Sequence, residues 1–277
     1  MFLSFRTIFL FILIISTGVS LTLAQNVTVS KEKTDKNKKE EKSSKQQSVD
    51  LSKFTGEQVA ESAIFIYGGL LGRDNLNQIR KTTFERGKIR ITDAAGKTET
   101  ANYERWVSRG ENLNKEKIRF DQTFPDAKYS LVYTGEKIFG LYNDSVFTPR
   151  EDASVAFQNQ IWRGLEGLLR YKENEAKPEL AGREKIMGVD FFLLDITDKQ
   201  NRKTRFYVSS KSFRVMMLEY EDTGVKYRRK FYDYNYAQGT LVPYRTVLLA
   251  NEREIEEIEI GTITFGQKIE DAMFQEG

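Results

Sequence analysis

The chain of 277 residues contains no cysteine and no histidine. Without cysteine, disulfides, thiol nucleophiles and cysteine-anchored lipids are all excluded. Without histidine, the chain lacks the commonest general base and the commonest metal ligand. A Ser-His-Asp triad, a Cys-His pair and a typical zinc site are therefore impossible. We expect no catalytic residue, no metal site and no cofactor.

An excess of charge of one sign is also missing. The chain has 43 lysines and arginines against 40 aspartates and glutamates, which gives a formal net charge of +3. A nucleic-acid-binding domain usually carries a strongly basic stripe, and this balance does not supply one. Hydrophobic residues make up 39% of the chain, which is enough for one sizeable core. We therefore predict a single folded domain that does not bind nucleic acid.

Two further patterns typical of enzymes are absent. The only carboxylates in strongly apolar sequence are Asp190, Asp195 and Asp233. A hydrolase with paired carboxylates needs two of them facing each other across a cleft, and no spacing here indicates such a pair. The glycine-rich stretch 68–72 lacks the Lys-Ser or Lys-Thr that follows in a phosphate-binding loop. The sequence thus favours a protein that is not an enzyme.

The N-terminus has the pattern of a signal peptide. Arg6 supplies positive charge, Ile8–Ile15 is an apolar run, and Thr22–Ala24 is a small-x-small cleavage site before Gln25. The alternative is an uncleaved membrane anchor, for which Phe2–Leu23 would have to supply the roughly 20 apolar residues of a span. We predict cleavage, and with either interpretation the rest of the chain is exported.

Residues 25–53, which follow the predicted signal peptide (1–24), show no apolar periodicity. They are rich in Lys and Glu, as in Lys38–Lys42. Because such a composition buries too little apolar surface to fold, we predict a disordered spacer. Its lysines could touch an anionic membrane surface, but a tether that carries the domain is the favoured interpretation.

Two helices are predicted at the start of the domain. Thr55–Gln58 matches a capping box. In this motif the first side chain accepts a hydrogen bond from the backbone amide three residues later, and the side chain of that later residue accepts one from the first residue's amide. The pair Gly68-Gly69 interrupts the helical pattern. Helical spacing predicts these inward faces: Val59, Ala63, Ile64 and Tyr67 in the first helix, and Leu70, Leu71, Leu76 and Ile79 in the second.

From Thr82 onward apolar and polar residues alternate, which predicts strands. Short links with turn residues, such as Ala95-Gly96, join neighbouring strands, so we expect an antiparallel sheet. Val189–Ile196 is apolar on both faces, which indicates cover on both sides. A curved sheet with helices on its concave face, or a closed barrel around a ligand, would provide it. The predicted strands are 83–93, 98–109, 117–123, 129–134, 137–142, 183–187, 189–197, 205–209, 213–221, 226–234, 242–251 and 255–265.

One further helix, Thr148–Tyr171, is predicted between the two blocks of strands. Its first residue and Glu151 match a second capping box, and Pro149 suits the first helical position. This amphipathic helix is either packed permanently on the core or a movable lid over a cavity. Gly164 and Gly167, which each cost a helix about 0.5–1 kcal/mol relative to Ala, favour mobility. The apolar stripe consists of Phe157, Ile161, Leu165, Leu168 and Leu169, with Trp162 at its edge.

Three groups of short motifs follow one another along the domain. They are Tyr67-Gly68-Gly69-Leu70 with Leu76, Ile79 and Gly87; Tyr232-Asp233-Tyr234 with Leu241-Val242-Pro243 and Arg245; and Ile258, Ile260, Ile263 and Phe274. Together with the signal peptide, they resemble the periplasmic LolA/LolB-like superfamily over residues 57–276. The resemblance implies a mainly β (α+β) fold, with a curved antiparallel sheet or half-open β-barrel of about eleven strands capped by helices. The half-barrel domain would span 54–277, with a helical lid at 148–172.

The resemblance also implies a function of binding. In this family the hydrophobic cavity holds lipid or lipoprotein acyl chains, so apolar side chains on strands and lid are candidate ligand-binding residues. Any sheet core shows an apolar stripe at period two, so plain core packing is the alternative for each. The candidates are Phe120, Tyr133, Phe139, Phe157, Ile161, Trp162, Leu165, Leu168, Phe191 and Phe213.

The sequence departs from the family in two places. The family's carriers hold the lid closed with a barrel arginine near an Arg-Pro-x-x-Phe segment. Here the proline is missing, and both Arg109 and Arg119 are candidates for that lid-closing role. The family's outer-membrane receptors carry a lipidated cysteine, which this chain lacks. A soluble, monomeric carrier fits better than an anchored acceptor.

The leading hypothesis is an exported, non-enzymatic carrier or binding protein for lipid or lipoprotein acyl chains in the bacterial envelope. Its partners would be the acyl chains and membrane-bound donor and acceptor proteins. The alternative is an envelope sensor or protein-interaction module on the same fold.

Overall fold

The computed structural model describes residues 53–143 and 145–276. The chain divides into two units, Met1–Ser48 and Val49–Gly277, and all the described residues belong to the second. The predicted signal peptide, and the predicted spacer except Lys53, lie outside the described residues.

The described residues form a mainly antiparallel β fold with a few short helices, as predicted. The helices are α1 (Gly56–Gly68), α2 (Gly72–Ile79), α3 (Glu151–Trp162) and α4 (Leu165–Leu169), with 3₁₀ turns η2 (Gly69–Leu71), η3 (Leu113–Lys115) and η4 (Asp271–Phe274). The strands are β1 (Thr82–Thr92), β2 (Thr98–Ser108), β3 (Lys117–Thr123), β4 (Lys128–Tyr133), β5 (Ile138–Tyr142), β6 (Ser145–Phe147), β7 (Lys177–Ile186), β8 (Val189–Thr197), β9 (Lys203–Ser209), β10 (Val215–Asp222), β11 (Val225–Ala237), β12 (Thr240–Ala250) and β13 (Arg253–Phe265).

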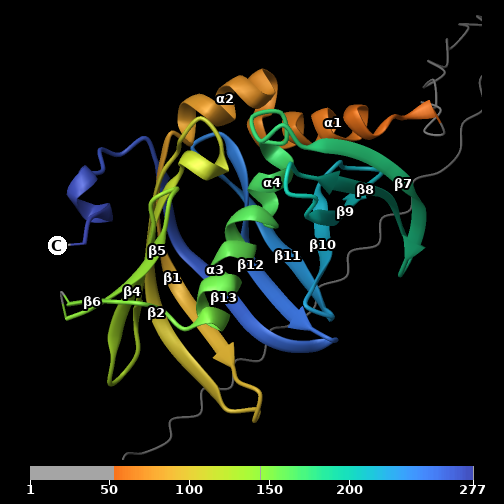
Figure 1. The fold of residues 1–277 in the computed structure, drawn as a ribbon. Coiled ribbons are helices and arrows are strands. Elements are labelled where there is room, and N and C mark those ends of the chain that lie inside the picture. Colours follow the sequence, from red (N-terminus) through yellow and green to blue (C-terminus); the bar gives the residue numbers. More distant parts are fainter. Residues whose placement is uncertain (1–52, 144, 277) are drawn as a thin grey trace, which may run out of the picture. The chain divides into compact units, whose positions relative to one another are not determined.

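All thirteen strands of the described region belong to one sheet, in the order β6-β5-β4-β3-β2-β1-β13-β12-β11-β10-β9-β8-β7. Strands that are adjacent in sequence pair with each other, except β6 and β7. The pairing of β1 with β13 joins the two blocks. The sheet is not closed, because β6 and β7 are its two free edges. Figure 1 shows that the sheet curves around α3, while α1 and α2 cover one end.

Two strand predictions needed correction at the edges. The three-residue strand β6 was not predicted, because so short a segment gives no alternation. Strand β7 begins at Lys177, six residues before the predicted Arg183. Pro178 lies within β7, and a proline is tolerated there because β7 is an edge strand.

Helix α1 forms as its capping box predicts. The Gln58 amide donates to Thr55 Oγ1, and the Thr55 amide donates to Gln58 Oε1. The predicted apolar face is buried against β7, β8 and β12. At its C-terminal end, the Tyr67 hydroxyl lies 2.8 Å from the Tyr234 hydroxyl of β11. Helix α1 thus closes one half of the concave face.

The predicted inward positions of Leu70 and Leu71 are wrong. These two side chains are 91% and 67% exposed. Helix α1 ends at Gly68, and Gly69 and Gly72 take positive φ angles of 66° and 50°, so the intervening turn projects away from the core. Of the predicted set for the second helix, Leu76 is the buried residue.

The predicted helix Thr148–Tyr171 is two helices. Arg150 keeps an extended backbone with ψ 149° and no side-chain cap, so α3 begins at Glu151 and the predicted capping box does not form. Acidic residues in the first turn still complement the helix dipole. The helix breaks at Gly164, where a Cβ would lie 2.5 Å from the Gln160 carbonyl oxygen. Gly164 therefore lies at the junction between the end of α3 and the start of α4.

Strand β8 is covered on both faces, but by different means. Phe192, Leu194 and Ile196 face the helices and belong to the largest core cluster. On the opposite, convex face, Phe191 packs edge-on against Tyr207 of β9 with ring centroids 6.1 Å apart. The second cover is therefore a layer of side chains from neighbouring strands. In β10, Met216 is 36% exposed, because a bulge after Val215 shifts the alternation.

The concave face carries two apolar clusters. One lies under α1 and α4 and includes Leu168, Phe192 and Leu241. The other lies under α3 and includes Phe120 and Phe157. A third cluster of Val132, Phe139 and Phe274 lies on the convex face of β4 and β5, where η4 covers it.

The break at Gly164 generates a stability prediction. In Gly164→Ala the new Cβ meets the Gln160 carbonyl, so we expect the free energy of unfolding to fall by about 1–3 kcal/mol in urea denaturation. The matched control is Gly261→Ala in β13, where the nearest atom to a Cβ is 3.5 Å away and no such loss is expected. Equal effects of the two substitutions would contradict the steric role of Gly164.

Candidate functional site

A cavity of about 190 Å³ lies between helices α3 and α4 and the centre of the concave face. Its floor is formed by β1, β2 and β11–β13, and its roof by α3 and α4. Apolar lining side chains include Val107, Phe157, Ile161, Leu165, Phe231, Ile258, Ile260 and Ile263. The charged lining side chains are Arg80, Glu85, Arg105, Arg109, Glu116, Glu166 and Arg229. The cavity is therefore amphipathic.

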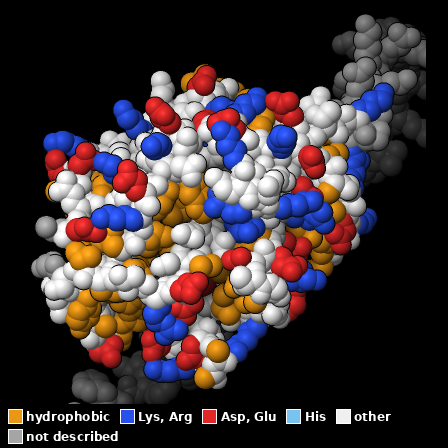
Figure 2. Space-filling view, in the orientation of Figure 1, with side chains coloured by type: hydrophobic (Ala, Val, Ile, Leu, Met, Phe, Trp, Pro, Cys, Tyr) orange, Lys and Arg blue, Asp and Glu red, His pale blue; other side chains and the backbone are white. Residues whose placement is uncertain are grey.

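Two open grooves flank the N-terminal half of α3. The groove on the side of β10–β12 has a volume of about 720 Å³ and is lined by Val155, Tyr220 and Leu248, among others. The groove on the side of β4–β6 has a volume of about 550 Å³ and is mostly apolar, with Val146 and Phe147 in its wall. Figure 2 shows hydrophobic side chains gathered over β4–β6 on this side. Helix α3 thus separates three spaces on one face of the sheet.

Glu166 at the start of α4 is held between two arginines. Arg80 Nη1 lies 3.0 Å from its Oε1, and Arg109 Nη2 lies 2.6 Å from its Oε2. Both arginines also donate to backbone carbonyls, Arg80 to Leu241 at 2.8 Å and Arg109 to Leu76 at 3.3 Å. Burial raises the pKa of Glu166, but the attraction of Arg109 and Arg80 outweighs it and lowers the pKa to about 2. Glu166 is therefore charged at neutral pH and fastens α4 to the sheet.

A second buried ion pair lies beside the first. Arg170 Nη1 donates to Glu116 Oε2 at 2.5 Å, and its Nη2 donates to the Gly110 carbonyl at 2.6 Å. Both side chains are almost completely buried, at 3% and 4% exposure. Burial raises the pKa of Glu116 to about 7, against the opposing attraction of Arg170. The pair ties the segment after α4 to the loop that precedes β3.

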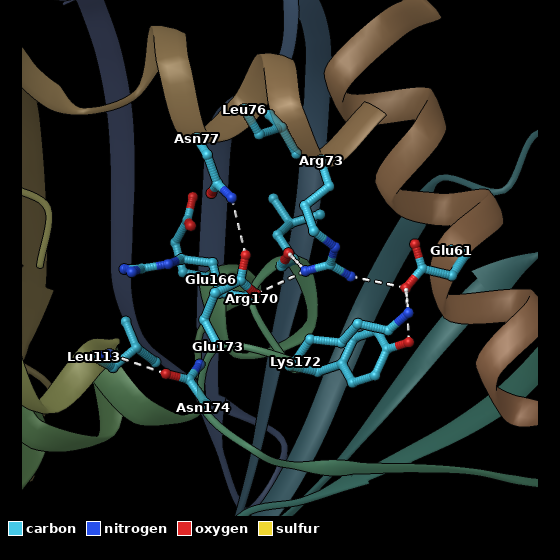
Figure 3. Close-up of polar contacts among 12 residues, drawn as sticks. Glu61, Arg73, Leu76, Asn77, Leu113, Glu166, Arg170, Lys172, Glu173 and Asn174 are labelled. Carbon is cyan, nitrogen blue, oxygen red and sulfur yellow. Dashed lines mark hydrogen bonds and ion pairs between the residues drawn. The ribbon is translucent and has the colours of Figure 1, made fainter. Parts of the chain in front are cut away.

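Further polar contacts fix the segment that follows α4 (Figure 3). Arg73 of α2 bridges Glu61 of α1 and Glu173, at 2.8 Å and 2.7 Å. The Leu113 amide donates to Asn174 Oδ1 at 2.9 Å. Figure 3 shows these side chains converging from α1, α2 and the loop around residue 113. Residues 165–174 are therefore anchored to several separate elements.

Helix α3 is held in a different way. Phe157 and Ile161 pack on the apolar cluster beneath it. Its polar contacts to the sheet lie near its C-terminal half: Asn159 donates to Asp222 at 2.7 Å, and Gln160 donates to Glu256 at 3.4 Å. Gln160 and Glu256 are only partly buried. Among the described residues, no buried ion pair fastens α3 itself.

The structure brings some of the predicted ligand-binding residues together. Phe157, Ile161 and Leu165 line the cavity. Phe120 and Tyr133 lie in the apolar cluster beside it, where Phe120 stacks on Phe157 at 6.4 Å.

Trp162, by contrast, is turned away from the cavity. It packs edge-on against Tyr133 at 6.1 Å, and the Arg202 guanidinium lies 4.4 Å from its ring. Trp162, one of the predicted ligand-binding residues, therefore does not line the cavity.

Four other predicted residues lie elsewhere. Leu168 is fully buried in the cluster under α1, and Phe213 stacks on Phe192 at the edge of that cluster. Phe139 and Phe191 lie on the convex face, because their positions in the strand alternation are opposite to those of Tyr133 and Phe192. Phe139 and Phe191 therefore cannot reach the cavity.

The two candidate lid-closing arginines also lie on opposite faces. Arg109 binds Glu166 of α4, as described above. Arg119 lies on the convex face, where it pairs with Asp121 at 2.8 Å and donates to the Met273 carbonyl. Of the two candidates, Arg109 contacts a helix on the concave face and Arg119 does not.

Apart from Arg109, the charged residues of the cavity were not predicted from the sequence. Arg105 follows Tyr103 and precedes Val107 at period two, so the strand alternation could have placed it inside. Glu166 stands alone among the apolar residues of α4, which was the corresponding signal in the helix. Arg80 gave no local signal, because its side chain enters the cavity from a loop after α2.

The arrangement around Glu166 predicts a pH-dependent contribution to stability. Removing one member of a buried ion pair costs about 3 kcal/mol, so Glu166→Gln should lower the free energy of unfolding by about that amount at pH 7. Because the pKa of Glu166 is depressed, this difference should be fully present above about pH 4.5 and vanish as the pH falls toward 2.

Urea denaturation at several pH values measures this difference. The control is Glu99→Gln, which removes an exposed pair with Lys97 and should change stability by less than about 1 kcal/mol. A Glu166→Gln effect that stays constant down to pH 2.5 would contradict the role of Arg80 and Arg109.

All helices within residues 53–143 and 145–276 are too short or too polar to cross a membrane.

Comparison with known proteins supports the fold. No protein-family model matches the chain, and no curated protein matches it by sequence. A LolA superfamily protein from Nitrosomonas europaea aligns with a TM-score of 0.58 and 13% identity, over 80% of this chain and 98% of that chain. A DUF1329 family protein from Desulfovibrio piger aligns with a TM-score of 0.54 and 15% identity, over 79% and 96%.

A third structure is a domain from Vibrio parahaemolyticus named for outer membrane lipoprotein sorting. It aligns with a TM-score of 0.51 and 13% identity, over 79% of this chain and 97% of that chain. At such low identities the likeness concerns the path of the chain and does not transfer a function. The chain has a LolA-like fold, an open curved antiparallel sheet capped by helices.

Proposed function

We propose that this protein is an exported, non-enzymatic carrier or binding protein for lipid or lipoprotein acyl chains in the bacterial envelope. The observation that carries the proposal is the cavity between α3–α4 and the concave face of an open sheet. One of the structures with this fold is named for outer membrane lipoprotein sorting, which supports the same class of ligand. The amphipathic lining suits a ligand with both an apolar chain and a polar end.

The cavity is small in this conformation, so uptake of a long chain requires movement. A cavity of about 150 Å³ accommodates a molecule such as benzene, and the space here is about 190 Å³. Helix α3 is the part that moves, because its contacts are mainly apolar, whereas α4 is fixed by buried ion pairs. The extended backbone at Gly164 provides the hinge between them.

Uptake replaces the apolar contacts of α3 with apolar contacts of the ligand. When α3 moves outward, Phe157 and Ile161 leave the apolar cluster of the sheet. Exposure of such side chains costs roughly 1.5–3 kcal/mol each, and every buried CH₂ of an acyl chain contributes about 0.8 kcal/mol in return. A chain of several methylenes offsets the cost, so the ligand replaces the helix on the same surface. Release to an acceptor follows the reverse path.

The ion pair of Arg109 with Glu166 limits how far the lid opens. It holds α4 against the end of β2 while α3 moves. In this proposal Arg109 anchors the fixed end of the lid, and α3 closes over the cavity through its apolar contacts. The protein would work in the periplasm after cleavage of the signal peptide, as a monomer, between membrane-bound donor and acceptor proteins.

A protein-interaction module is the second candidate, and one observation favours it. The groove beside β6 is lined by exposed apolar side chains, with Tyr142 49% and Val146 46% exposed. Val146→Glu separates the two possibilities. If acyl chains extend into this groove, the variant binds them more weakly. If the groove serves a protein partner, acyl binding is unchanged.

Acyl binding should depend on the cavity wall. Titration of the purified mature domain with a dansyl-labelled fatty acid should show saturable binding, and Leu165→Glu should weaken it at least tenfold, because a carboxylate would replace an apolar lining group. Leu70→Glu, at a 91% exposed leucine, is the control and should bind normally. Absence of saturable binding in the unmodified protein would refute the carrier function.

Movement of α3 can be tested by cross-linking, because the chain has no cysteine of its own. Cysteines in place of Asn159 and Asp222, whose side chains are hydrogen-bonded at 2.7 Å, can be joined by a short cross-linker that a reductant cleaves. We expect the linked protein to take up the labelled fatty acid at least tenfold more slowly, with recovery after reduction. Stopped-flow fluorescence measures the rate.

The control pair for this experiment replaces Asn77 and Glu173, which are hydrogen-bonded at 3.0 Å across the anchored segment. Linking these two positions should not change the rate, because residues 165–174 stay in place. If the first pair has no effect, or if both pairs slow uptake equally, α3 is not the lid.

A further inference from the structure

Arg105 of β2 stands out among the charged residues of the cavity. Its guanidinium donates no hydrogen bond to any described residue, and its Nε has no partner there. The nearest ion pair joins Arg105 Nη2 to Glu85 Oε2 at 3.7 Å, beyond hydrogen-bond distance. The Arg105 side chain is 31% exposed and lines the cavity. Its terminal Nη groups are therefore available to a ligand in the cavity.

The other arginines of the cavity are engaged. Arg80 and Arg109 share Glu166, and Arg229 lies 2.8 Å from Glu256. Arg105 interacts only weakly with the carboxylate of Glu85. Glu85 Oε1 already accepts a hydrogen bond from the Tyr103 hydroxyl at 2.8 Å. Tyr103 thus satisfies part of Glu85 without using Arg105.

Positive charge is in excess around the cavity. Two arginines share the single carboxylate of Glu166, so one cationic group has no anion of its own. The charged groups that line the cavity, together with their ion-pair partners, are the arginines Arg80, Arg105, Arg109, Arg170 and Arg229, against the glutamates Glu85, Glu116, Glu166 and Glu256. A single anionic group in the cavity would balance this set.

We infer that the cavity selects amphiphiles with one anionic group, a carboxylate or a phosphate monoester, and that Arg105 binds this group. The inference rests on the proposed function and specifies its ligand class. The planar fork of a guanidinium matches the geometry of both oxyanions and binds them through two parallel hydrogen bonds. The apolar chain of the ligand would lie along Ile258, Ile260 and Ile263, which line the same cavity.

The test compares ligands that share an alkyl chain and differ in their headgroup, one of which is uncharged. The probes are a long-chain fatty acid, its methyl ester and the corresponding monoalkyl phosphate, each measured by displacement of the dansyl-labelled fatty acid. Because a hydrogen bond to a charged group stabilises by about 1.5–3 kcal/mol, both anions should bind about ten- to hundredfold more tightly than the ester. Acetate and inorganic phosphate, tested alone, report whether the anion site works without a chain.

Substitutions assign the preference to Arg105. In Arg105→Gln the anions should bind only as well as the ester, whose affinity should not change. Arg105→Lys should retain part of the preference, because the charge remains and the fork is lost. The control is Arg86→Gln on β1, where the side chain is exposed and lies on the face opposite to Glu85.

Glu85 gives an independent measurement of the same site. Glu85→Gln removes the carboxylate that competes for Arg105, so the preference for anions should increase. If Arg105→Gln leaves Glu85 uncompensated and fails to fold, the double variant Arg105→Gln/Glu85→Gln removes both charges and should show no preference. A purely structural ion pair would not make the two single variants move in opposite directions.

The outcomes separate the inference from the proposed function. Equal binding of acid and ester to the unmodified protein would overturn the role of Arg105 and leave the carrier function standing. Binding of none of the three amphiphiles would refute the carrier function itself. Tight binding of inorganic phosphate alone, unaffected by an attached chain, would also overturn the inference, because it would show a site for free anions.

Discussion

The structure depends on how the concave face of an open sheet is covered. An open sheet of this length leaves a large apolar surface that must be buried by something other than a second sheet. Helices α1 and α4 cover one half and α3 covers the other. The position of this cover is set by Glu166, which two arginines from different parts of the chain hold in place. The cavity lies between this cover and the centre of the sheet.

The charges in the cavity distinguish this protein from a simple apolar container. A purely apolar cavity would accept any hydrocarbon, and its selectivity would come from size alone. Here arginines and glutamates from β1, β2, β11 and the loops lie beside isoleucines of β13. Buried charges are costly unless they are paired, so their pairing indicates a defined orientation for whatever binds. The same residues that fix α4 therefore also give the cavity a polar end.

Helices α3 and α4 are held on the sheet by different kinds of contact. Ion pairs and backbone hydrogen bonds fix residues 165–174 in direction as well as in position. Helix α3 rests on Phe157 and Ile161, and apolar contacts of this kind are not directional. In the proposed function, an acyl chain replaces such contacts at little net cost, whereas it does not replace an ion pair. The break at Gly164 separates α3, which is held by apolar contacts, from α4, which is held by ion pairs.

The sequence by itself determined the fold class and most of the strands, because the alternation of apolar and polar residues that marks a strand is contained in that strand's own residues. It also determined the capping of α1, which involves residues only three apart. It did not determine the break between α3 and α4, because Gly164 is equally compatible with one weakened helix and with two separate helices.

The assignment of residues to the cavity was decided by tertiary structure. Phe139 and Phe191 are apolar and strand-borne like Phe120, but the face that a strand turns inward depends on what packs against it. The central contact of Glu166 with Arg80 and Arg109 joins residues that lie far apart along the chain. No local pattern encodes such a contact, because it exists only after β1 and β13 have joined the two blocks of strands into one sheet.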